Sequence, residues 1–410
     1  MKYTTSFPNR KLYGKISLPA SKSISNRLLI IRASSPDDFP LDGLSDSDDT
    51  QALQQGLQSV TDVIDIGHAG TSMRFLTAYL AATGQVKTVT GSGRMKNRPI
   101  GDLVSALNQL GASISYPEKT GYPPIRTSGN PISGNFIEIS GNVSSQFISA
   151  MLLVAPTLPY GLTIRIKDEP VSTSYIRMTL ELMQQAGVCS VWEKDAITVA
   201  RQDYRSEGMT VERDWSAASY WYQMAALAAD AEILLEGMTE KSLQGDAIIS
   251  QMACAFGVQT QYTPEGALLT KYGSICRSLE LDLINTPDLV QTMVVACCLN
   301  NIRFRFAGVQ TLRIKETDRV AALQNELLKL GYCVKETKPG IMEWNGERTE
   351  PQQTVCISTY HDHRMAMAFA PAAIHFPGLQ IEDPKVVSKS YPNFWNDLKK
   401  VGFMIEKDDC

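Results

Sequence analysis

The chain has 410 residues, of which 43% are hydrophobic and 20% charged, and its formal net charge at pH 7 is −4. The length suggests two or three domains with hydrophobic cores, and the composition is typical of a globular protein. The small negative charge argues against binding to nucleic acid or to an anionic membrane surface. If the ligands are anionic, the positive charge that holds them must therefore be gathered locally.

Targeting signals and cysteines point to a reducing compartment. The N-terminal segment carries a lysine with no apolar core after it, so we expect no secretory signal peptide. The longest apolar runs, such as 365–376, are too short to span a bilayer. The eight cysteines form no CxxC pair and mostly lie in apolar stretches, so we expect buried, reduced thiols. These features predict a cytoplasmic protein.

One supersecondary pattern recurs along the chain: an amphipathic helix that ends at a glycine and is followed at once by a short strand. The pattern suits glycine because the residue that ends a helix often takes a left-handed conformation. The copies recur roughly every seventy residues, and they end at Gly111, Gly187, Gly257, Gly331 and Gly402, with a weaker first copy around Gly56.

Six copies predict two similar α/β domains, each built from three helix-and-strand units. The junction is expected near Glu212, Arg213 and Asp214, where a strand-like segment gives way to a new helix. A solenoid is the alternative, but such repeats need polar capping units at their ends, and nothing in the sequence resembles one.

Polar and basic residues gather where apolar helices are predicted to begin. A helix start offers unpaired N–H groups and partial positive charge, so it can hold an anion. The alternative is that the hydroxyls and aspartates are only helix N-caps, but this explains poorly why Lys or Arg recurs in four of the six openings. The openings are Ser21, Lys22, Ser23 and Arg27; Gly70, Thr71, Ser72 and Arg74; Ser144, Ser145 and Gln146; Asp288; Lys315, Glu316 and Arg319; and Asp362 and Arg364.

Two loops add further positive charge, each just before a predicted helix. A run of charges is usually a solvated face, but these charges precede turns that contain glycine or proline, which favours a site. The residues are Arg94, Lys96 and Arg98 in the first loop, and Lys385 and Lys389 in the second.

Two carboxylates are candidates for chemistry. Asp288 lies in an otherwise apolar stretch, where an unpaired charge would be costly, although it could equally be a helix N-cap. Glu316 lies close enough to Lys315 and Arg319 for ion pairing or for acid–base work at an anionic centre.

Other common chemistries find no support. The sequence has no GxxxxGK[ST], no GxGxxG after a strand and no GxSxG, which argues against a P-loop, a dinucleotide site and a serine-hydrolase elbow. The sequence His361-Asp362-His363 could suggest a metal site, but the chain has only four histidines and no Cys-His spacing. Three further aspartates are better explained as helix caps than as a cation site: Asp46, Asp48 and Asp49.

Eight segments resemble, in order, the motifs of the 5-enolpyruvylshikimate-3-phosphate synthase family. They extend from about residue 19 to residue 392 and are LPASKSISNR, AGTSMR, GRMKNRPIGDL, VSSQF, VSTSYI, RIKETDR, HDHRMAM and DPKVVSKSYP. The resemblance implies an α/β (α+β) fold, the inverse α/β barrel of enolpyruvyl transferases, with two domains of three βαβαββ units each. One domain would comprise 1–18 and 214–410, the other 19–213, with the active site in a cleft that closes between them.

The resemblance also implies a reaction. The family transfers the enolpyruvyl group of phosphoenolpyruvate to the 5-hydroxyl of shikimate 3-phosphate, through a tetrahedral intermediate, in the biosynthesis of chorismate and aromatic amino acids. No cofactor, metal, nucleic acid or membrane is implied, and we expect a monomer. Asp288 would take the proton from the hydroxyl, and Glu316 with Lys22 would protonate the methylene carbon, although the sequence leaves the exact proton assignment open.

Binding residues follow from the same motifs. The phosphoenolpyruvate site would use Lys22, Gly70, Thr71, Arg94, Gln146, Arg319, Arg364 and Lys389. The shikimate-3-phosphate site would use Ser23, Arg27, Ser144, Ser145, Gln146, Ser172, Tyr175, Asp288, Thr311 and Lys315. Several cations are needed because two highly charged anions must be held side by side.

The sequence departs from the family pattern at three positions. His68 replaces a usual asparagine and is expected to donate a hydrogen bond in its place; Phe75 replaces a proline and bears on packing behind the phosphoenolpyruvate pocket; Thr311 replaces an asparagine on the shikimate-phosphate side. Gly70 is retained, which leaves the room that a pocket inhibitor such as glyphosate needs.

Three rival functions are less well supported. The related transferase that acts on UDP-N-acetylglucosamine typically has a cysteine in the loop GSGRMKNRPIG, and this chain has none there. RNA 3′-phosphate cyclase shares repeated units, but its motifs match only slightly and the net charge does not suit RNA. A non-catalytic phosphoanion-binding relative would have lost Asp288, Glu316 or Lys22, all of which are present.

Overall fold

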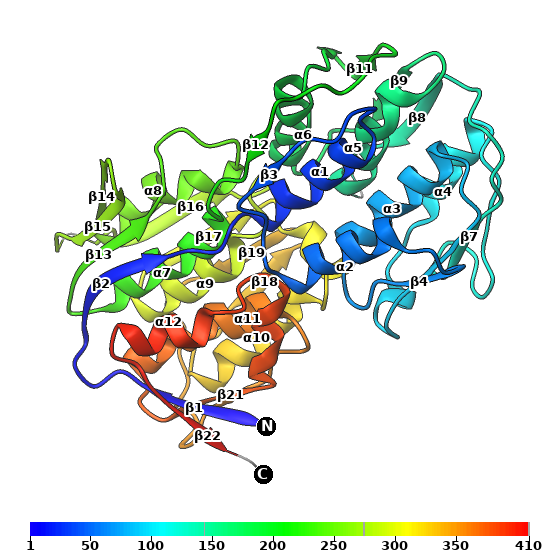
Figure 1. Ribbon diagram of the computed structural model, residues 1–410. Helices are drawn as coiled ribbons and strands as arrows, with labels where there is room; N and C mark the ends of the chain where they lie inside the picture. The colour runs from blue at the N-terminus through cyan, green and yellow to red at the C-terminus, as the bar shows by residue number, and fades with distance from the viewer. Residues whose placement is uncertain (143, 274, 409–410) are drawn as a thin grey trace. The chain divides into compact units, whose positions relative to one another are not determined.

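The computed structural model describes residues 1–142, 144–273 and 275–408 (Figure 1). The chain folds into two compact units. Unit 1 consists of Met1–Pro19 and Glu212–Cys410, and unit 2 consists of Ala20–Val211. Both ends of the chain therefore belong to unit 1, where the first strand and the last strand pair side by side (Figure 1).

Unit 2 contains short strands and longer helices in alternation. Its strands are β3 (Leu41–Asp42), β4 (Val63–Asp65), β5 (Thr88–Thr90), β6 (Ile114–Ser115), β7 (Ile125–Thr127), β8 (Phe136–Ser140), β9 (Leu162–Lys167), β10 (Val191–Glu193), β11 (Ala196–Val199) and β12 (Met209–Thr210). Its helices are α1 (Lys22–Ala33), α2 (Asp48–Gln58), α3 (Gly70–Ala82), η1 (Met95–Asn97), α4 (Gly101–Gln109), α5 (Ser145–Val154), η2 (Ala155–Thr157) and α6 (Thr173–Gln185).

Unit 1 follows the same alternation. Its strands are β1 (Lys2–Ser6), β2 (Lys11–Ser17), β13 (Asp230–Glu236), β14 (Val258–Thr263), β15 (Gly266–Lys271), β16 (Ser278–Asp282), β17 (Arg303–Ala307), β18 (Lys335–Lys338), β19 (Ile341–Trp344), β20 (Cys356–Ile357), β21 (Leu379–Glu382) and β22 (Met404–Asp408). Its helices are α7 (Trp215–Leu227), η3 (Gly245–Ile248), α8 (Ile249–Met252), η4 (Ala253–Phe256), α9 (Val290–Leu299), η5 (Gln310–Ile314), α10 (Arg319–Lys329), α11 (His363–Phe369), η6 (Ala370–Ile374), η7 (Pro384–Lys389) and α12 (Phe394–Lys400).

One sheet pattern recurs in both units. The first two strands are connected by a helix, and they lie parallel to each other. Two antiparallel strands then add beside the second of them, as in β8, β9, β11 and β10. Among the described residues five sheets have this strand arrangement, although in one of them the parallel strands β2 and β13 are separated in sequence by the whole of unit 2, and in another the N-terminal strand β1 lies next to β21. The predicted α/β fold with repeated βαβαββ units is confirmed. Around α1 and α2 the strands reduce to the parallel pair β3 and β12.

The core of each unit lies along helices that are apolar on nearly every side. In unit 1 every residue of α9 and α11 is buried, as is every residue of α7 except Ser216. In unit 2 every residue of α5 except Gln146 is buried. A helix that is apolar all round can be stable only inside a core, so these helices are central and their polar first turns are fixed in place.

Glycines end the helices as predicted, with one exception. Gly111, Gly187, Gly257, Gly331 and Gly402 all have a positive φ, between 71° and 103°. The prediction around Gly56 was wrong, because this residue lies inside α2, which continues to Gln58. Glycine suits that position for another reason: a Cβ there would lie 2.6 Å from Leu76 Cδ1 of α3.

The thiols differ in part from expectation. The seven described cysteines are all free, and Cys297 and Cys298 are buried, but Cys189 and Cys254 are exposed, so burial was predicted wrongly for these two. Cys410 lies outside the described residues. Within the described residues, no helix combines the length and the hydrophobicity that a membrane span requires.

Candidate active site

Arg319 forms the centre of a cluster of ion pairs in unit 1. This first residue of α10 is 1% exposed, and its Nε donates to Asp362 Oδ2 at 2.7 Å. Its two Nη atoms donate to Glu316 Oε2 at 2.9 Å and to Asp288 Oδ1 at 3.3 Å. Burial alone would lower the pKa of Arg319, but the surrounding carboxylates, Asp362 first, raise it above the ordinary value. Arg319 is therefore a permanent buried cation.

Two more cations extend the cluster on either side. Arg364 Nη2 lies 2.8 Å from Asp288 Oδ2, and Lys389 Nζ lies 2.9 Å from Glu316 Oε1. Cations and carboxylates thus alternate in the series of contacts Lys389, Glu316, Arg319, Asp288 and Arg364. Glu316 and Asp288 each pair with two cations. The structure brings together five residues that the sequence analysis assigned to the site: Asp288, Glu316, Arg319, Arg364 and Lys389.

Helix capping explains part of this geometry. Asp362 is the N-cap of α11, and its Oδ1 accepts a hydrogen bond from Arg364 N at 2.9 Å while its other oxygen holds Arg319. Asp288 is not an N-cap, because that position of α9 is Leu289. The N-cap alternative for Asp288 is therefore wrong, and its carboxylate instead pairs with Arg319 and Arg364.

The neighbouring predicted residues lie on the segment before α10. Thr311 lies in η5 and is buried, and Lys315 follows η5 directly and is half-buried. Asp318, the N-cap of α10, accepts a hydrogen bond from Ala321 N at 3.1 Å, which fixes where the helix begins. This cap places Arg319 in the first turn of α10.

In unit 2, α1 carries Lys22 and Ser23 in its first turn. Ser21 is the N-cap, and Lys22 Nζ lies 3.3 Å from Asp49 Oδ2 in the first turn of α2. Asp48 and Asp49 are not N-caps as expected, since that position is Ser47. Asp49 instead offsets the charge of Lys22.

Arg27 lies in the interior of unit 2. It is 2% exposed, and its guanidinium donates to four neutral oxygens: Thr179 Oγ1 at 2.7 Å, Ser23 O at 2.8 Å, and Ser149 Oγ and Tyr175 O at 3.2 Å each. Burial lowers the pKa of Arg27 to about 10, so it is still cationic at neutral pH. It adds positive charge behind Ser23 and Tyr175.

The α3 opening packs tightly against an arginine. A Cβ on Gly70 would lie 2.3 Å from Arg98 Nη1, so a larger residue here would displace this guanidinium. Thr71 Oγ1 accepts a hydrogen bond from Gln146 Nε2 at 3.3 Å, which brings the first turns of α3 and α5 together. Arg94 lies on the same loop as Arg98 and is exposed.

The remaining predicted residues of unit 2 occupy helix starts. Ser144 is the N-cap of α5 and accepts from Gln146 N at 3.3 Å, and Ser145 is buried directly after it. Ser172 is the N-cap of α6 in a left-handed conformation, with φ 56°, and its carbonyl accepts from Tyr175 N at 3.1 Å. The N–H groups of such helix starts can bind an anion.

The departures from the family pattern have visible contacts. His68 Nδ1 lies 2.9 Å from Ser92 Oγ, so its ring takes part in a hydrogen bond. Phe75 is buried, and its ring centroid lies 5.6 Å from the Arg27 guanidinium carbon, so it packs against this cation. At the possible metal site, His361 Nδ1 contacts Asp383 Oδ2 at 3.0 Å, and His363 is buried in α11.

A family model described as "EPSP synthase (3-phosphoshikimate 1-carboxyvinyltransferase)" matches residues 52–398 of the chain. The chain belongs to this family.

Relatives and solved structures of the EPSP synthase family align along nearly the whole chain. A curated 3-phosphoshikimate 1-carboxyvinyltransferase from Bacteroides fragilis (strain YCH46) is 51% identical over 407 residues, with 99% of both chains covered. One from Shewanella loihica is 36% identical, with 95% of this chain and 96% of the relative covered. The structure of an EPSP synthase from Acinetobacter baumannii has a TM-score of 0.75 at 20% identity, with 100% of both chains covered, and so shows the same fold.

Sequence reasoning missed several residues around Arg364 of this EPSP synthase family member. Arg364 donates to Tyr220 OH and to Ser216 Oγ, both at 3.4 Å, and Ser216 Oγ donates to Asp246 at 2.5 Å. The signal for Ser216 was present, since DWSAASYW is another polar opening of an apolar helix, but it was interpreted only as a domain junction. Nothing in the pattern around Asp246 marks it.

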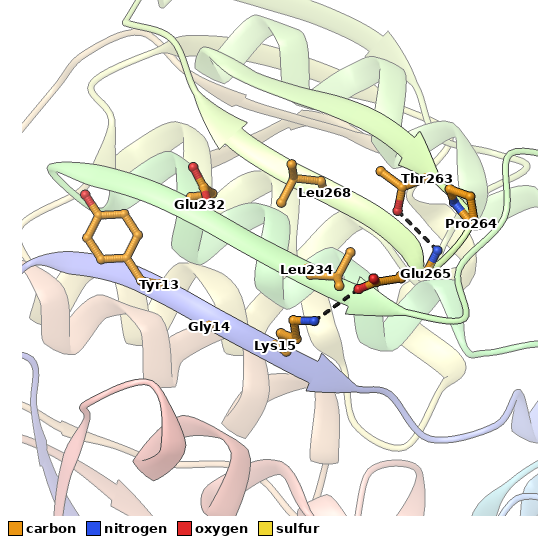
Figure 2. Close-up of a pocket in the computed structure, with 9 residues that line it drawn as sticks. All are labelled: Tyr13, Gly14, Lys15, Glu232, Leu234, Thr263, Pro264, Glu265 and Leu268. Atoms are coloured by element: carbon orange, nitrogen blue, oxygen red, sulfur yellow. Dashed lines mark hydrogen bonds and ion pairs between the residues drawn. The ribbon is translucent and has the colours of Figure 1, made fainter.

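A hollow in unit 1 lies apart from these residues. It has a volume of about 650 Å³ and lies over the open face of β2, β13, β14 and β15, with Tyr13, Leu234 and Leu268 along it (Figure 2). Lys15 Nζ lies 3.0 Å from Glu265 Oε2 at its edge (Figure 2). None of its nine lining residues is a predicted site residue.

Proposed function

We propose that this protein is a 3-phosphoshikimate 1-carboxyvinyltransferase. It transfers the enolpyruvyl group of phosphoenolpyruvate to the 5-hydroxyl of shikimate 3-phosphate and releases phosphate, a step in the biosynthesis of chorismate and aromatic amino acids. The observation that carries this proposal is the full-length match to curated enzymes of that name. The Arg319 cluster supports it, because it gathers several cations beside two carboxylates that remain partly exposed.

Phosphoenolpyruvate is proposed to bind to the cations of this cluster, together with Lys22, Arg94, Gln146 and the Gly70-Thr71 backbone. In the cluster, Asp288 and Glu316 offset the charge of Arg319, Arg364 and Lys389. An arriving phosphate or carboxylate would take over part of that pairing, since Arg offers a two-pronged fit to such groups. The two carboxylates would then be available for proton transfer.

The reaction is proposed to proceed by addition and elimination. Asp288 accepts the proton of the 5-hydroxyl as its oxygen bonds to C2 of phosphoenolpyruvate, and Glu316, with Lys22, protonates the methylene carbon. In the second stage the bond from C2 to the phosphate oxygen breaks, and the same group removes a proton from the new methyl. The surrounding cations stabilise the negative charge that moves to the phosphate.

Shikimate 3-phosphate is proposed to bind to helix starts of unit 2 and to the segment before α10. Hydroxyls and N–H groups would come from Ser23, Ser144, Ser145, Gln146, Ser172 and Tyr175, with Asp288, Thr311 and Lys315 at the ring. Arg27 supports binding of shikimate 3-phosphate indirectly, because its buried positive charge lies behind Ser23 and Tyr175. The residues assigned to the two substrates come from both units.

The protein is further proposed to act in the cytoplasm as a monomer and without a cofactor. Free cysteines, some of them exposed, suit a reducing compartment. One chain supplies every residue assigned to the two substrates, so a second copy is not needed to complete the site. Analytical ultracentrifugation at micromolar concentration is expected to give a single species near the chain mass of 45.2 kDa.

The assay that tests the function is release of inorganic phosphate from phosphoenolpyruvate by the native chain. Release is expected only when shikimate 3-phosphate is also present, with one enolpyruvyl product formed per phosphate. No release with both substrates would overturn the proposal. Release that depends on UDP-N-acetylglucosamine instead would assign the chain to the related transferase.

A further inference from the structure

Asp246 is a buried carboxylate close to the Arg319 cluster but outside every motif of the sequence analysis. It lies in η3, is 4% exposed, and its Oδ2 accepts a hydrogen bond from Ser216 Oγ at 2.5 Å. Ser216 lies in the first turn of α7 and is the one residue of that helix that is not fully buried. A buried carboxylate is thus connected to the polar opening of a central helix.

The direction of this hydrogen bond determines what Ser216 offers to its other neighbour. A serine hydroxyl has a single proton, and Ser216 gives it to Asp246, so its oxygen can only accept from Arg364 Nη2, 3.4 Å away. The same Nη2 pairs with Asp288 Oδ2 at 2.8 Å. Asp246 is therefore linked to the Arg364 guanidinium through one hydroxyl.

Burial and three charged groups, Asp288, Arg364 and Asp214, act on the pKa of Asp246. Burial raises the pKa of Asp246 to about 7, and the negative charges of Asp288 and, to a smaller extent, Asp214 also raise it. The hydrogen bond from Ser216 and the charge of Arg364 lower it. The carboxyl group therefore changes its charge close to neutral pH.

We infer that Asp246 is a positioning residue for enolpyruvyl transfer: through Ser216 it holds the Arg364 guanidinium in the orientation that binds phosphoenolpyruvate. This inference rests on the proposed function. When Asp246 is ionised, Ser216 must present its oxygen to Arg364. When Asp246 is protonated, the carboxyl can donate to Ser216, and the serine proton is free to turn toward Arg364, which then loses an acceptor.

The test compares Asp246→Asn and Ser216→Ala with the native chain, using phosphate release with both substrates between pH 5.5 and 9. At pH 8 each variant is expected to raise the KM for phosphoenolpyruvate about tenfold, the effect of one hydrogen bond to a charged group. The KM for shikimate 3-phosphate should change by less than about twofold, because Arg364 is assigned to the other substrate. The double variant should match the single ones, since both break the same link.

The pH profile separates this role from a merely structural one. The ratio of kcat/KM for phosphoenolpyruvate, native over Asp246→Asn, is expected to rise as pH increases through about 7 and to approach one at pH 5.5, because only the native side chain ionises. Ionisation of the substrate itself is common to both proteins and cancels in the ratio. A ratio that is independent of pH, or equal changes in both KM values, would overturn the inference.

Asp397→Asn is the matched control. Asp397 is also a buried carboxylate of unit 1, 1% exposed, and it accepts hydrogen bonds from Tyr391 OH and Asn393 Nδ2 at 2.8 Å each. This variant should leave both KM values and the pH profile unchanged. If the native chain releases phosphate and Asp246→Asn behaves like the control, the inference fails and the function stands; if the native chain releases none, both fail.

Discussion

At the residue scale, the buried pair of Arg319 and Asp362 is the firmest contact of the cluster. Their side chains are 2% and 0% exposed, and the atoms Nε and Oδ2 lie 2.7 Å apart. Removing water from two charges costs free energy, which mutual attraction offsets only when both partners are present. The pair therefore holds the start of α10 against the start of α11. Asp288 and Glu316 remain nearer to solvent.

Replacing Asp362 by asparagine should destabilise the protein strongly. The substitution leaves Arg319 buried with less compensating charge, so the free energy of unfolding is expected to fall by about 3–5 kcal/mol. Urea denaturation followed by circular dichroism measures this. Glu343→Gln is the control, because it breaks the exposed pair with Arg305 and should cost about 1 kcal/mol or less. Equal losses in the two variants would contradict the assigned burial cost.

Asp246 should make stability depend on pH. Its pKa is raised in the folded state, from 3.8 to about 7, so the folded protein holds a proton that the unfolded chain releases. Folding stability from this group is complete below pH 3.8 and is lost progressively as pH rises through 7. Asp246→Asn is therefore expected to raise the melting temperature relative to the native chain by more at pH 8 than at pH 5. A constant difference would contradict the raised pKa.

Single residues of the site could be predicted from the sequence, but their partners could not. Lys22, Asp288, Glu316, Arg319 and Arg364 were chosen as candidates because they open apolar helices or lie in family motifs, and their roles stay predictions. The contacts that fix their chemistry join residues far apart in the chain, such as Arg319 with Asp362, 43 positions away. A local sequence pattern does not show which helix starts contact one another in the fold. Asp246 was missed for this reason.

At the element scale, helix ends were the most readable feature. A glycine that ends a helix takes a positive φ, which depends only on the local backbone. This was predicted correctly for five glycines. Gly56 was predicted wrongly because this glycine lies inside a helix, where its small size leaves space for Leu76 of another helix. Sequence spacing does not show such a tertiary contact. The pairing order of the strands is equally non-local, and it was expected only through the family resemblance.

Gly331→Ala tests the role of these helix ends. Gly331 has φ 86°, and a Cβ there would lie 2.5 Å from Thr349 O, so the helix that carries Arg319 cannot end in the same way. Gly402→Ala is the control, with φ 102° but no atom nearer than Phe7 Cε2 at 3.6 Å. We expect the control to cost about 1 kcal/mol for the left-handed conformation alone. Thermal denaturation should show a clearly larger loss for Gly331→Ala; equal losses would mean that the contact with Thr349 is unimportant.

At the scale of the whole molecule, the same sheet pattern builds both units, and each unit carries part of the proposed site. Unit 1 contributes the alternating cluster around Arg319, and unit 2 contributes Lys22 and the helix starts proposed for shikimate 3-phosphate. The repeat explains why polar helix openings recur along the sequence: each central helix begins with such a turn.

If Lys22 and Glu316 serve the same proton transfer, as proposed, their substitutions should not have independent effects. Lys22→Gln and Glu316→Gln are each expected to reduce kcat strongly, and the double variant should be much less impaired than the product of the two effects predicts, since both groups serve the same proton transfer. Steady-state rates of phosphate release measure this cycle. Fully multiplicative effects would indicate that the two residues act in separate steps.

The most direct test of the account is phosphate release by Glu316→Gln beside the native chain, with both substrates present and Glu343→Gln as the control for losing a carboxylate from unit 1. Loss of a general acid typically costs a factor of about 10² to 10⁴. We predict that kcat falls by at least about 100-fold in Glu316→Gln and stays within about twofold of native in the control. A Glu316→Gln rate close to native would contradict the central claim that the Arg319 cluster carries the chemistry.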